Sequence, residues 1–357
     1  MILAKDVQIY VKATETCNLN CSHCFTSGIN GKKIYFNADS TARFLTEMSH
    51  QYGLNSMRLI FHGGEPMLCP LESLYSFYEQ TKDIKGVQYG IQTNLVYKLT
   101  SEKKEFFKRV ISTTGIGTSW DHDVRFGSVS AARKESDLSL WENNVRELVQ
   151  DGHELTLMVC LSSSLIKSFE PSQILEYAIS LGFKYILFER LTSDGNAKKN
   201  DHLFPENADL DQWIYKMYHQ TMENRYFEKI GNMFLDEIAT SFLKRAHVAN
   251  RCRGCEQKLM TINADGSIAG CPNSASNENW GRIDDKVSTF VSSPQRVNAI
   301  CKEKIRNNAC LSCDVSDLCN GDCYKLPWDS HCPAPKSLFQ HLKFDSHSIE
   351  LNNLLLT

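Results

Sequence analysis

Apolar and polar positions follow two alternating rhythms through the first half of the chain. Short runs rich in β-branched and aromatic residues predict strands, and most runs are followed by a segment whose apolar residues recur at helical spacing. The predicted strands cover residues 6–14, 56–62, 86–94, 114–120, 153–161 and 184–191. The predicted helices cover residues 38–53, 71–82, 101–112, 138–152 and 171–183; the first ends at Gly53 and the third begins at a Ser101 N-cap. Strands that alternate with helices indicate an α/β fold built from parallel βαβ units.

The second half of the chain has a different pattern. Residues 205–248 contain stretches with helical spacing and no predicted strand. Residues 258–271 alternate apolar and polar positions around the sequence Ala-Asp-Gly-Ser, which predicts a β-hairpin. The residues after Cys332 show no informative pattern, and the chain has no internal repeat. We therefore expect one large α/β domain followed by a smaller unit.

The composition narrows the possible partners. Of the 357 residues, 42% are hydrophobic and 23% are charged, as in ordinary soluble globular proteins. The net charge of −3 gives no electrostatic reason to expect nucleic acid or an anionic membrane as a partner. The N-terminus lacks the features of a signal peptide, and no apolar run reaches the ~20 residues that cross a bilayer.

The 14 cysteines are clustered rather than scattered. Three stand at positions 17, 21 and 24, and nine fall between Cys252 and Cys332. Without a secretion signal, a disulfide framework is the weaker interpretation, and the short spacings indicate metal binding. We therefore expect a reducing, cytoplasmic location. Cys69, Cys160 and Cys301 stand outside the motifs described below and are expected to be packing residues.

The N-terminal cysteines form an incomplete ligand set. Cys17, Cys21 and Cys24 follow the first predicted strand within a single loop. A structural zinc site and a 4Fe–4S cluster both need four ligands. Three thiolates on a cubane cluster leave one iron without a protein ligand, and such an open position can bind a substrate or cosubstrate. The alternative is a zinc loop completed by His23 or by a remote residue.

A second motif accompanies the three cysteines. The sequence His-Gly-Gly-Glu-Pro occupies residues 62–66, just after the second predicted strand. Together the two motifs resemble those of radical S-adenosylmethionine (SAM) enzymes, a resemblance that covers residues 6–191. In that family the three cysteines hold a 4Fe–4S cluster, whose open iron binds the amino and carboxylate groups of SAM. The resemblance implies a partial (β/α)6 TIM-type barrel over residues 1–204 and a helical bridging region over residues 205–248.

The resemblance also implies which residues contact SAM. The glycines let the backbone approach the ligand, Glu65 accepts a hydrogen bond from the methionyl ammonium, and Pro66 fixes the turn. Polar residues at strand ends hold the ribose and carboxylate, and Phe25 takes the adenine contact because His23 replaces the usual aromatic residue before Cys24. The full set is Phe25, Gly63, Gly64, Glu65, Pro66, Asn94, Ser119, Asp121 and Arg125. Taken singly, each is also typical of an ordinary turn or strand-end cap.

The C-terminal cysteines resemble the SPASM extension of radical SAM enzymes. Cys255 is followed by Gly266 and Cys271, and a Cys-x-x-Cys-x5-Cys-x3-Cys run begins at Cys310. The resemblance implies a SPASM domain over residues 249–340, before a tail at 341–357, with two fully ligated 4Fe–4S clusters. The family's interleaved pattern assigns Cys252, Cys255, Cys271 and Cys323 to the first cluster, and Cys310, Cys313, Cys319 and Cys332 to the second. The alternative is a pair of zinc ribbons.

The resemblance implies an enzyme with three 4Fe–4S clusters and SAM as cofactors. An electron from a reductant such as flavodoxin or ferredoxin cleaves SAM to methionine and a 5′-deoxyadenosyl radical, which takes a hydrogen atom from an unactivated C–H bond. Enzymes with a SPASM extension mostly modify peptides, so we expect a ribosomally made precursor peptide as the substrate. No winged-helix recognition domain fits before Cys17, so a separate peptide-recognition protein or direct docking on this chain is needed.

Three products compete. Formylglycine-forming enzymes carry an acidic residue directly after the cysteine that corresponds to Cys271, where this chain has Pro272. Thioether-forming enzymes often begin with a fused recognition domain. We therefore favour a carbon–carbon crosslink of the cyclophane type, between an aromatic ring and a side-chain β-carbon. The alternative from another class, a non-catalytic iron–sulfur electron carrier, would not need the His-Gly-Gly-Glu-Pro motif. The sequence identifies no general base.

Overall fold

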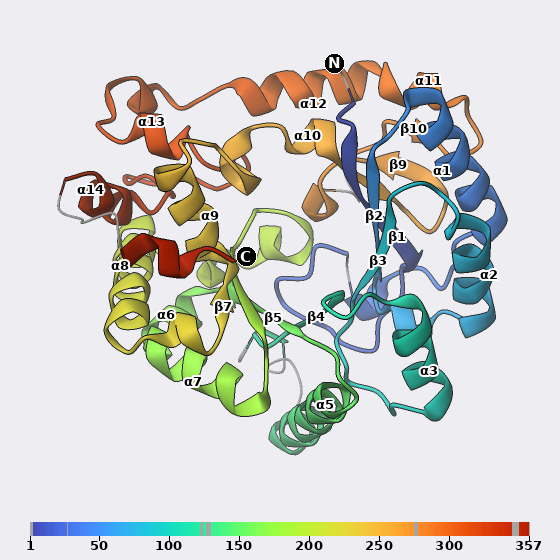
Figure 1. Ribbon diagram of the computed structural model, residues 1–357, viewed down its shortest axis with the longest axis horizontal. Coiled ribbons are helices and arrows are strands. Elements are labelled where there is room, and N and C mark those ends of the chain that lie inside the picture. Colours follow the sequence, from blue (N-terminus) through green and yellow to red (C-terminus); the bar gives the residue numbers. More distant parts are fainter. Residues whose placement is uncertain are drawn as a thin grey trace.

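The computed structural model describes residues 3–26, 28–121, 124–125, 130–274, 278–344 and 350–356. Across this part of the chain one ten-stranded sheet runs in the order β10-β9-β8-β1-β2-β3-β4-β5-β6-β7 (Figure 1). Its central strands are β1 (Asp6–Thr14), β2 (Ser56–Gly63), β3 (Val87–Gln92), β4 (Ile116–Ser119), β5 (Thr156–Leu161) and β6 (Tyr185–Arg190). Each pairs in parallel with the next, which confirms the predicted pattern of parallel strands in a mixed α/β fold.

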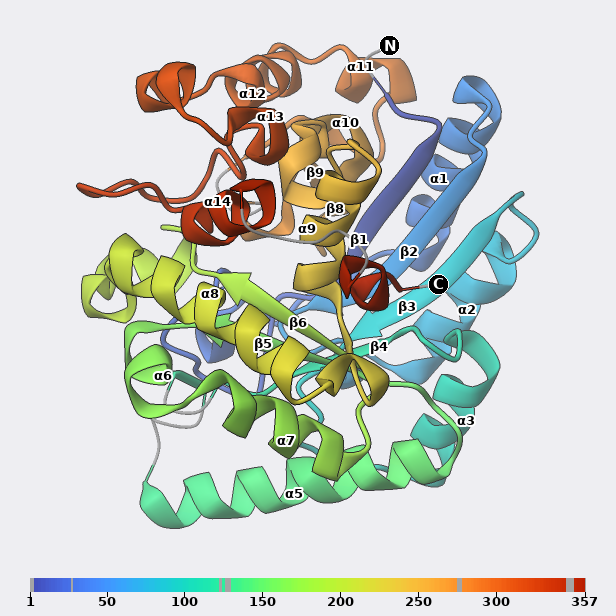
Figure 2. The same cartoon turned by 60° about the vertical axis from the view of Figure 1, so that its left-hand side comes forward.

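Helices connect the parallel strands and lie around the outside of the curved sheet (Figures 1 and 2). They are α1 (Ala38–Tyr52), α2 (Leu71–Thr81), α3 (Ser101–Val110), α5 (Ala131–Gln150), α6 (Ser163–Ser168) and α7 (Pro171–Leu181). All but the short α6 were predicted. The predicted stop of α1 is also confirmed, because Gly53 takes a left-handed conformation with φ of 55° that suits glycine.

Two helix starts differ from the prediction. The N-cap of α3 is Thr100 rather than Ser101, because the Thr100 side chain accepts a hydrogen bond from the backbone N–H of Lys103. Helix α5 begins at Ala131 instead of residue 138, since the Ser130 side chain caps it there. Side-chain capping of this kind competes with the apolar pattern in setting where a helix begins.

Aromatic side chains fill the layer between the sheet and the outer helices. Phe61 of β2 packs against Phe77 of α2 and Phe106 of α3, with ring centroids 5.7 Å apart in both pairs. Trp141 of α5 is fully buried, and its indole N–H donates a 2.9 Å hydrogen bond to the Thr118 hydroxyl of β4. This layer buries one face of the sheet, which leaves the inner face to line a cavity.

The predicted hairpin forms, and it also extends the sheet. Strands β8 (Leu259–Ile262) and β9 (Ser267–Ala269) pair antiparallel, as the alternating pattern predicted. Strand β8 also pairs in parallel with β1, with Tyr10 opposite Thr261, which was not predicted. The pairing covers what would otherwise be an exposed sheet edge at β1. A two-residue strand, β10 (Gly281–Arg282), pairs with β9 and ends the sheet on this side.

The region predicted to be helical at 205–248 contains two long helices and one short strand. These are α8 (Asn207–Glu223), β7 (Gly231–Asn232) and α9 (Met233–Leu243). The strand was not predicted; it pairs with β6 and closes the other end of the sheet.

The cysteine-rich region contains mostly short helices. They are α10 (Cys255–Lys258), α11 (Val287–Val291), α12 (Pro294–Lys304), α13 (Ser316–Cys319) and α14 (Lys336–Phe344). In Figure 2 the segment from α11 to α13 passes over the upper end of the molecule. Part of the C-terminal tail is ordered against the core, because Leu351 and Leu354 are buried; residues 345–349 and 357 of the tail lie outside the described residues. Over the described ranges, every helix is too short or too polar to cross a membrane.

A buried ion pair joins the sheet to the cysteine-rich region. The guanidinium of Arg190, the last residue of β6, donates two hydrogen bonds to the Asp322 carboxylate, at 2.8 and 2.9 Å, and a third to the Pro333 carbonyl oxygen. Asp322 also accepts a hydrogen bond from the backbone N–H of Cys323. Burial alone would raise the pKa of Asp322, but the charge and hydrogen bonds of Arg190 hold it below its ordinary value. The pair fixes the Cys319–Cys323 loop against the end of β6.

We expect Arg190→Met to lower the free energy of unfolding by about 3–5 kcal/mol, because it leaves the Asp322 carboxylate buried without its cation. Urea denaturation at neutral pH measures the change. The control is Lys82→Met, which breaks the exposed Lys82–Glu79 pair and should cost less than about 1 kcal/mol. Similar losses in the two variants would contradict the role assigned to the buried pair.

Candidate functional site

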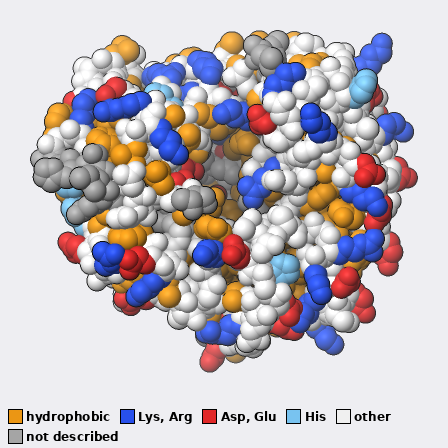
Figure 3. Space-filling view, in the orientation of Figure 1, with side chains coloured by type: hydrophobic (Ala, Val, Ile, Leu, Met, Phe, Trp, Pro, Cys, Tyr) orange, Lys and Arg blue, Asp and Glu red, His pale blue; other side chains and the backbone are white. Residues whose placement is uncertain are grey.

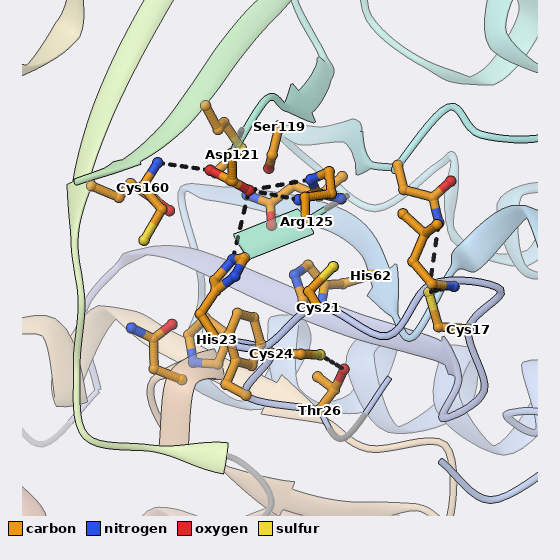
Figure 4. Close-up of a pocket in the computed structure, with 18 of the residues that line it drawn as sticks. Cys17, Cys21, His23, Cys24, Thr26, His62, Ser119, Asp121, Arg125 and Cys160 are labelled. Atoms are coloured by element: carbon orange, nitrogen blue, oxygen red, sulfur yellow. Dashed lines mark hydrogen bonds and ion pairs between the residues drawn. The ribbon is translucent and has the colours of Figure 1, made fainter. Parts of the chain in front are cut away.

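A pocket lies at the carboxyl ends of the parallel strands (Figure 4). Side chains alternate between the two faces of a sheet, so within most strands only every second residue reaches the pocket. The strand residues that line it are Tyr10, His62, Gly63, Gln92, Gly117, Ser119, Met158, Cys160, Glu189 and Arg190. The pairing register aligns neighbours in this row, as where Cys160 lies opposite Glu189. The face of the molecule seen in Figure 3 is hollowed near its centre.

The loop after β1 carries the three N-terminal cysteines into this pocket. Cys17, Cys21 and Cys24 all line it (Figure 4). Two distant segments hold the loop in place. The Asn18 side chain donates to the Val96 carbonyl oxygen at 2.6 Å, and the backbone N–H of Asn196 donates to the Cys24 carbonyl oxygen at 2.8 Å.

The surroundings of these thiols oppose and assist ionisation at the same time. Burial raises the pKa of Cys17 to about 11 and that of Cys21 to about 12, while the Arg125 guanidinium lowers both. The Cys17 sulfur also accepts hydrogen bonds from the backbone N–H of Leu19 at 3.4 Å and from the Asn94 side chain at 3.5 Å. Thiolates bind metals, so a nearby cation and N–H donors suit a metal-binding loop.

The Gly63–Gly64 turn packs directly on the segment that leads into the cysteine loop. A Cβ atom on Gly64 would lie 2.0 Å from the Thr16 carbonyl oxygen, and one on Gly63 would lie 2.2 Å from the Thr14 carbonyl oxygen. Gly63 also has φ of 141°, which side chains rarely allow. Both glycines line the pocket. Glycine is required here because two backbone segments meet without room for a side chain.

Glu65 follows this turn and stabilises it through hydrogen bonds made outside the pocket. It is fully buried, and neither it nor Pro66 lines the pocket. Its Oε1 accepts hydrogen bonds from the Met67 N–H and the Thr93 hydroxyl, and its Oε2 accepts one from the Asn94 N–H at 2.7 Å. Burial raises the pKa of Glu65, although these bonds oppose the shift. In this arrangement the carboxylate ties the turn to the end of β3, and its contact with the SAM ammonium stays a prediction.

Asp121 organises the opposite side of the pocket. Its Oδ1 accepts a hydrogen bond from the Cys160 N–H at 2.8 Å. Its Oδ2 pairs with the Arg125 guanidinium at 3.0 Å and lies 3.6 Å from Nε2 of His23 (Figure 4). Because its carboxylate is already engaged, Asp121 orients Arg125 and His23 within the pocket.

An aromatic stack occupies the space between the cysteine loop and β1. Phe25 stacks on His62, with ring centroids 5.5 Å apart and an interplanar angle of 17°. His62 in turn meets the Tyr10 ring edge-on. Burial lowers the pKa of His62 to about 3, so this ring is neutral at physiological pH. His62 therefore covers one face of Phe25, and the adenine contact of Phe25 stays a prediction.

The structure brings most of the predicted SAM contacts to one place. All of them line the pocket except Glu65 and Pro66. Glu189, Pro272 and Asn273 line it too, although they were not predicted as site residues. The alternation within residues 184–191 puts every second side chain on one face, but it does not say which face holds the pocket.

The cysteines assigned to the first auxiliary cluster lie near one another. A hydrogen bond with Cys255 lowers the pKa of Cys252, and the same bond, together with burial and Cys323, raises the pKa of Cys255. Burial, with a smaller contribution from the charge of nearby Cys323, raises the pKa of Cys271 to about 12. Cys323 is therefore close to both Cys255 and Cys271, although long stretches of sequence separate them.

The cysteines assigned to the second auxiliary cluster are grouped in the same way. Burial, with smaller contributions from the charges of nearby Cys310 and Cys313, raises the pKa of Cys332 to about 11. Burial also raises the pKa of Cys319, with Cys332 among the charges that add to the shift. Cys332 is thus near Cys310, Cys313 and Cys319, and the assignment of the two sets of four to clusters stays a prediction.

The chemistry of these side chains bears on which metal centre they could hold. Among the described residues, no three Cys, His, Asp or Glu side chains converge so as to hold one ion. A zinc site needs four donors within ~2.0–2.3 Å of one ion. A cubane cluster spreads its thiolates over separate irons, so they need not converge on one point. The donor chemistry, with thiols in every group, fits iron–sulfur clusters.

Comparisons with known proteins support the fold. No family model matches the chain. It is 23% identical to the uncharacterized protein MJ0907 of Methanocaldococcus jannaschii over 326 residues, which is 85% of this chain and 94% of that protein. Among solved structures, anSMEcpe with bound AdoMet and Cp18Cys peptide matches with a TM-score of 0.74 at 15% identity, covering 97% of this chain and 98% of that one. Streptococcus suis SuiB bound to S-adenosylmethionine matches with a TM-score of 0.62 at 14% identity, covering 92% and 77%.

At these identities the likeness is one of fold. The chain has the mixed α/β fold with a large parallel sheet that these radical SAM enzymes have. The resemblance noted from the cysteine and His-Gly-Gly-Glu-Pro motifs is therefore confirmed at the level of the fold.

We expect Gly64→Ala to destabilise the protein by about 1–3 kcal/mol, as overpacking does, because the added carbon collides with the Thr16 carbonyl oxygen. Chemical denaturation measures the loss. The control is Gly254→Ala, whose added carbon meets nothing nearer than 3.7 Å and should have little effect. If Gly64→Ala is as stable as the control, the turn does not need glycine and the packing described above is wrong.

Proposed function

We propose that this chain is a radical SAM peptide maturase, which removes a hydrogen atom from a ribosomally made precursor peptide and installs an oxidative crosslink. In this proposal residues 1–204 form a partial (β/α)6 barrel, residues 205–248 a helical bridge, residues 249–340 a SPASM domain and residues 341–357 a tail. One observation carries it: a single pocket is lined by Cys17, Cys21 and Cys24, by the Gly63–Gly64 turn and by polar residues that end β3 and β4.

When bound, the N-terminal 4Fe–4S cluster and SAM supply the one-electron chemistry that removes a hydrogen atom from an unactivated C–H bond. The chain's own residues hold, orient and shield these groups. In our proposal Cys17, Cys21 and Cys24 ligate this cluster. The proposed SAM contacts are Phe25, Gly63, Gly64, Asn94, Ser119, Asp121 and Arg125, with Glu65 and Pro66 supporting the turn.

Two further 4Fe–4S clusters complete the proposed cofactor set. The first would be held by Cys252, Cys255, Cys271 and Cys323, and the second by Cys310, Cys313, Cys319 and Cys332. A set of four cysteines leaves no open iron, so such clusters suit electron transfer rather than substrate binding. The proposal requires an external one-electron reductant such as flavodoxin or ferredoxin, and a reducing compartment such as the cytoplasm.

A peptide is the proposed substrate. Two solved structures of similar fold contain peptides: anSMEcpe with its Cp18Cys peptide and SuiB with its precursor peptide SuiA. In this chain Thr192, Pro272 and Asn273 form an uncharged part of the pocket wall, in which the Asn273 side chain donates to the Thr192 hydroxyl at 3.2 Å. Because Pro272 follows Cys271 directly, a side chain bound against this wall would lie close to the first auxiliary cluster.

A carbon–carbon crosslink is the product we favour. The formylglycine-forming branch places an acidic residue directly after the cysteine that corresponds to Cys271. Pro272 occupies that position here and lines the pocket, so it supplies no carboxylate. A carbon radical that adds to a neighbouring aromatic ring must then lose an electron and a proton to restore aromaticity. A thioether would need the same two losses and differs only in the atom that is joined.

Side-chain oxidation without a crosslink is the second candidate. The observation that favours it is the match to anSMEcpe, which covers nearly all of both chains and is closer in fold than the match to SuiB. Pro272 weighs against it. The product decides between the two.

We expect co-expression with a cognate precursor peptide, to be sought among the neighbouring genes, to yield a peptide lighter by two hydrogens. The joined residues should not separate in tandem mass spectrometry, because a ring encloses the bonds between them. Cys17→Ala should abolish the product, since it removes a cluster ligand. Cys301→Ala is the matched control and should leave the yield unchanged, because Cys301 is exposed and belongs to no cysteine group.

Other products would separate the alternatives. A link through a peptide cysteine sulfur would replace our product with a thioether. A formylglycine without a link would favour the second candidate. Product formation by the Cys17→Ala variant would contradict the proposed function altogether.

A further inference from the structure

Glu189 differs from the other acidic residue of the pocket. Only Asp121 and Glu189 supply carboxylates among the described residues that line it. Asp121 is fully engaged by Cys160, Arg125 and His23. Glu189 has no hydrogen bond or ion pair with any residue in the described part of the chain. Its side chain is accessible to solvent within the pocket, while the surrounding protein encloses its carboxylate.

The strand geometry explains why Glu189 stays unpaired. Successive residues of β6 point to opposite faces of the sheet. Arg190 therefore points away from its neighbour and is held by Asp322, 2.8 Å away. Cys160, opposite Glu189 on β5, offers no cation. The fold thus leaves the Glu189 carboxylate in the cavity without a cation, because the guanidinium of Arg190, which also lines the pocket, is held by Asp322.

The groups that face Glu189 come from four other elements. They are Tyr10 of β1, Asp121 after β4, Cys160 of β5 and Glu237 of α9. None is a cation. Burial, and after it the charges of Asp121 and Glu237, raise the pKa of Glu189 to about 7. A carboxyl group in this range exchanges protons readily near neutral pH.

Glu189 also lies on the side of the pocket assigned above to the peptide. Leu191 and Thr192, which follow in the chain, also line the pocket. The Thr192 hydroxyl accepts a hydrogen bond from the Asn273 side chain. The charges of Glu189 and of Cys271 both raise the pKa of Tyr10, so Tyr10 lies near both residues. A substrate between these walls would touch the carboxylate of Glu189 while lying near the first auxiliary cluster.

We propose that Glu189 is the catalytic base that accepts the proton released when the substrate radical is oxidised. This inference rests on the proposed function, because it concerns the second half of the same reaction. It assigns a residue to a step for which the sequence identified none. Position 272 carries a proline and therefore no carboxylate, and Glu189 of β6 supplies one instead.

The step balances as a two-electron oxidation. The substrate β-carbon loses a hydrogen atom to the SAM-derived carbon, and the resulting radical forms a bond with a ring carbon. The ring adduct then gives one electron to an oxidised iron–sulfur cluster and one proton to the Glu189 carboxylate. Two C–H bonds break, one C–C bond forms, and the peptide loses two hydrogens in all.

The first test uses Glu189→Gln and Glu189→Asp with the precursor peptide that the wild-type chain modifies. Removing the base should lower the crosslinked product formed per 5′-deoxyadenosine by about 100-fold or more, while hydrogen abstraction continues. Glu189→Asp keeps a carboxylate and should recover part of the yield. In the wild type the yield should rise as the pH passes upward through about 7, where Glu189 becomes ionised.

Glu237→Gln is the matched control. It removes a negative charge near Glu189 but lies outside the pocket lining. It should keep the crosslink yield and move the midpoint of the pH profile downward, because one of the charges that raise the Glu189 pKa is gone.

The second test needs neither SAM nor peptide. A carboxyl group whose pKa is raised by folding stabilises the folded state below its unfolded pKa, and this stabilisation is lost as the pH rises through the folded value. The thermal midpoint of Glu189→Gln should therefore rise relative to that of the wild type as the pH is raised from 5 to about 8. A constant difference would show that Glu189 ionises as in solution, and would overturn the proposal.

The outcomes separate this inference from the proposed function. If the wild type makes no 5′-deoxyadenosine, the proposed function fails whatever the stability test shows. If Glu189→Gln keeps the product per 5′-deoxyadenosine and the wild-type pH profile, the base is another group. If it only raises the KM for the peptide, Glu189 binds a substrate cation and the proposal is wrong.

Discussion

The parallel pairing of β8 with β1 is the constraint on which the rest of the molecule depends. Strand β1 leads into the loop that carries Cys17, and the β8–β9 hairpin leads into Cys271. The register places Tyr10 opposite Thr261, and Thr261 opposite Ala269, in one row across three strands. This row brings the cysteine-rich half of the chain to the wall of the pocket. Pro272 and Asn273, which follow Cys271, therefore line the same cavity as the three N-terminal cysteines.

The carboxylates in and around the site are of two kinds, those that the protein binds with hydrogen bonds and one that it does not. Glu65 accepts three hydrogen bonds from the protein, and Asp322 is held by Arg190 and a backbone N–H, so the protein itself fixes the position of both carboxylates. Glu189 lacks such partners within the described ranges and faces the cavity. The satisfied carboxylates fix the positions of loops, since breaking a buried polar contact is costly. The unsatisfied one is left for chemistry.

Much of the fold followed from local pattern, because alternation and helical spacing report which faces are buried. The strand at residues 6–14 and the hairpin around Gly266 are examples. Pairing between distant strands, as between β8 and β1, leaves little trace in either segment and was missed. For the site, cysteine spacing was informative because ligand geometry restricts it. Glu189 was not found, because one charged residue in a strand does not reveal which face will hold the cavity, and the role expected of Glu65 did not foresee its three internal partners.

The central claim is that Cys17, Cys21 and Cys24 hold an iron–sulfur cluster with one iron open to SAM. Electron paramagnetic resonance of the anaerobically reconstituted and reduced protein, recorded with and without SAM, tests it most directly. The account predicts that SAM changes the signal of one cluster, and that replacing the three cysteines by alanine removes both that signal and its response to SAM while the other clusters stay. A spectrum that SAM leaves unchanged, or a protein isolated anaerobically with zinc in place of iron, would contradict it.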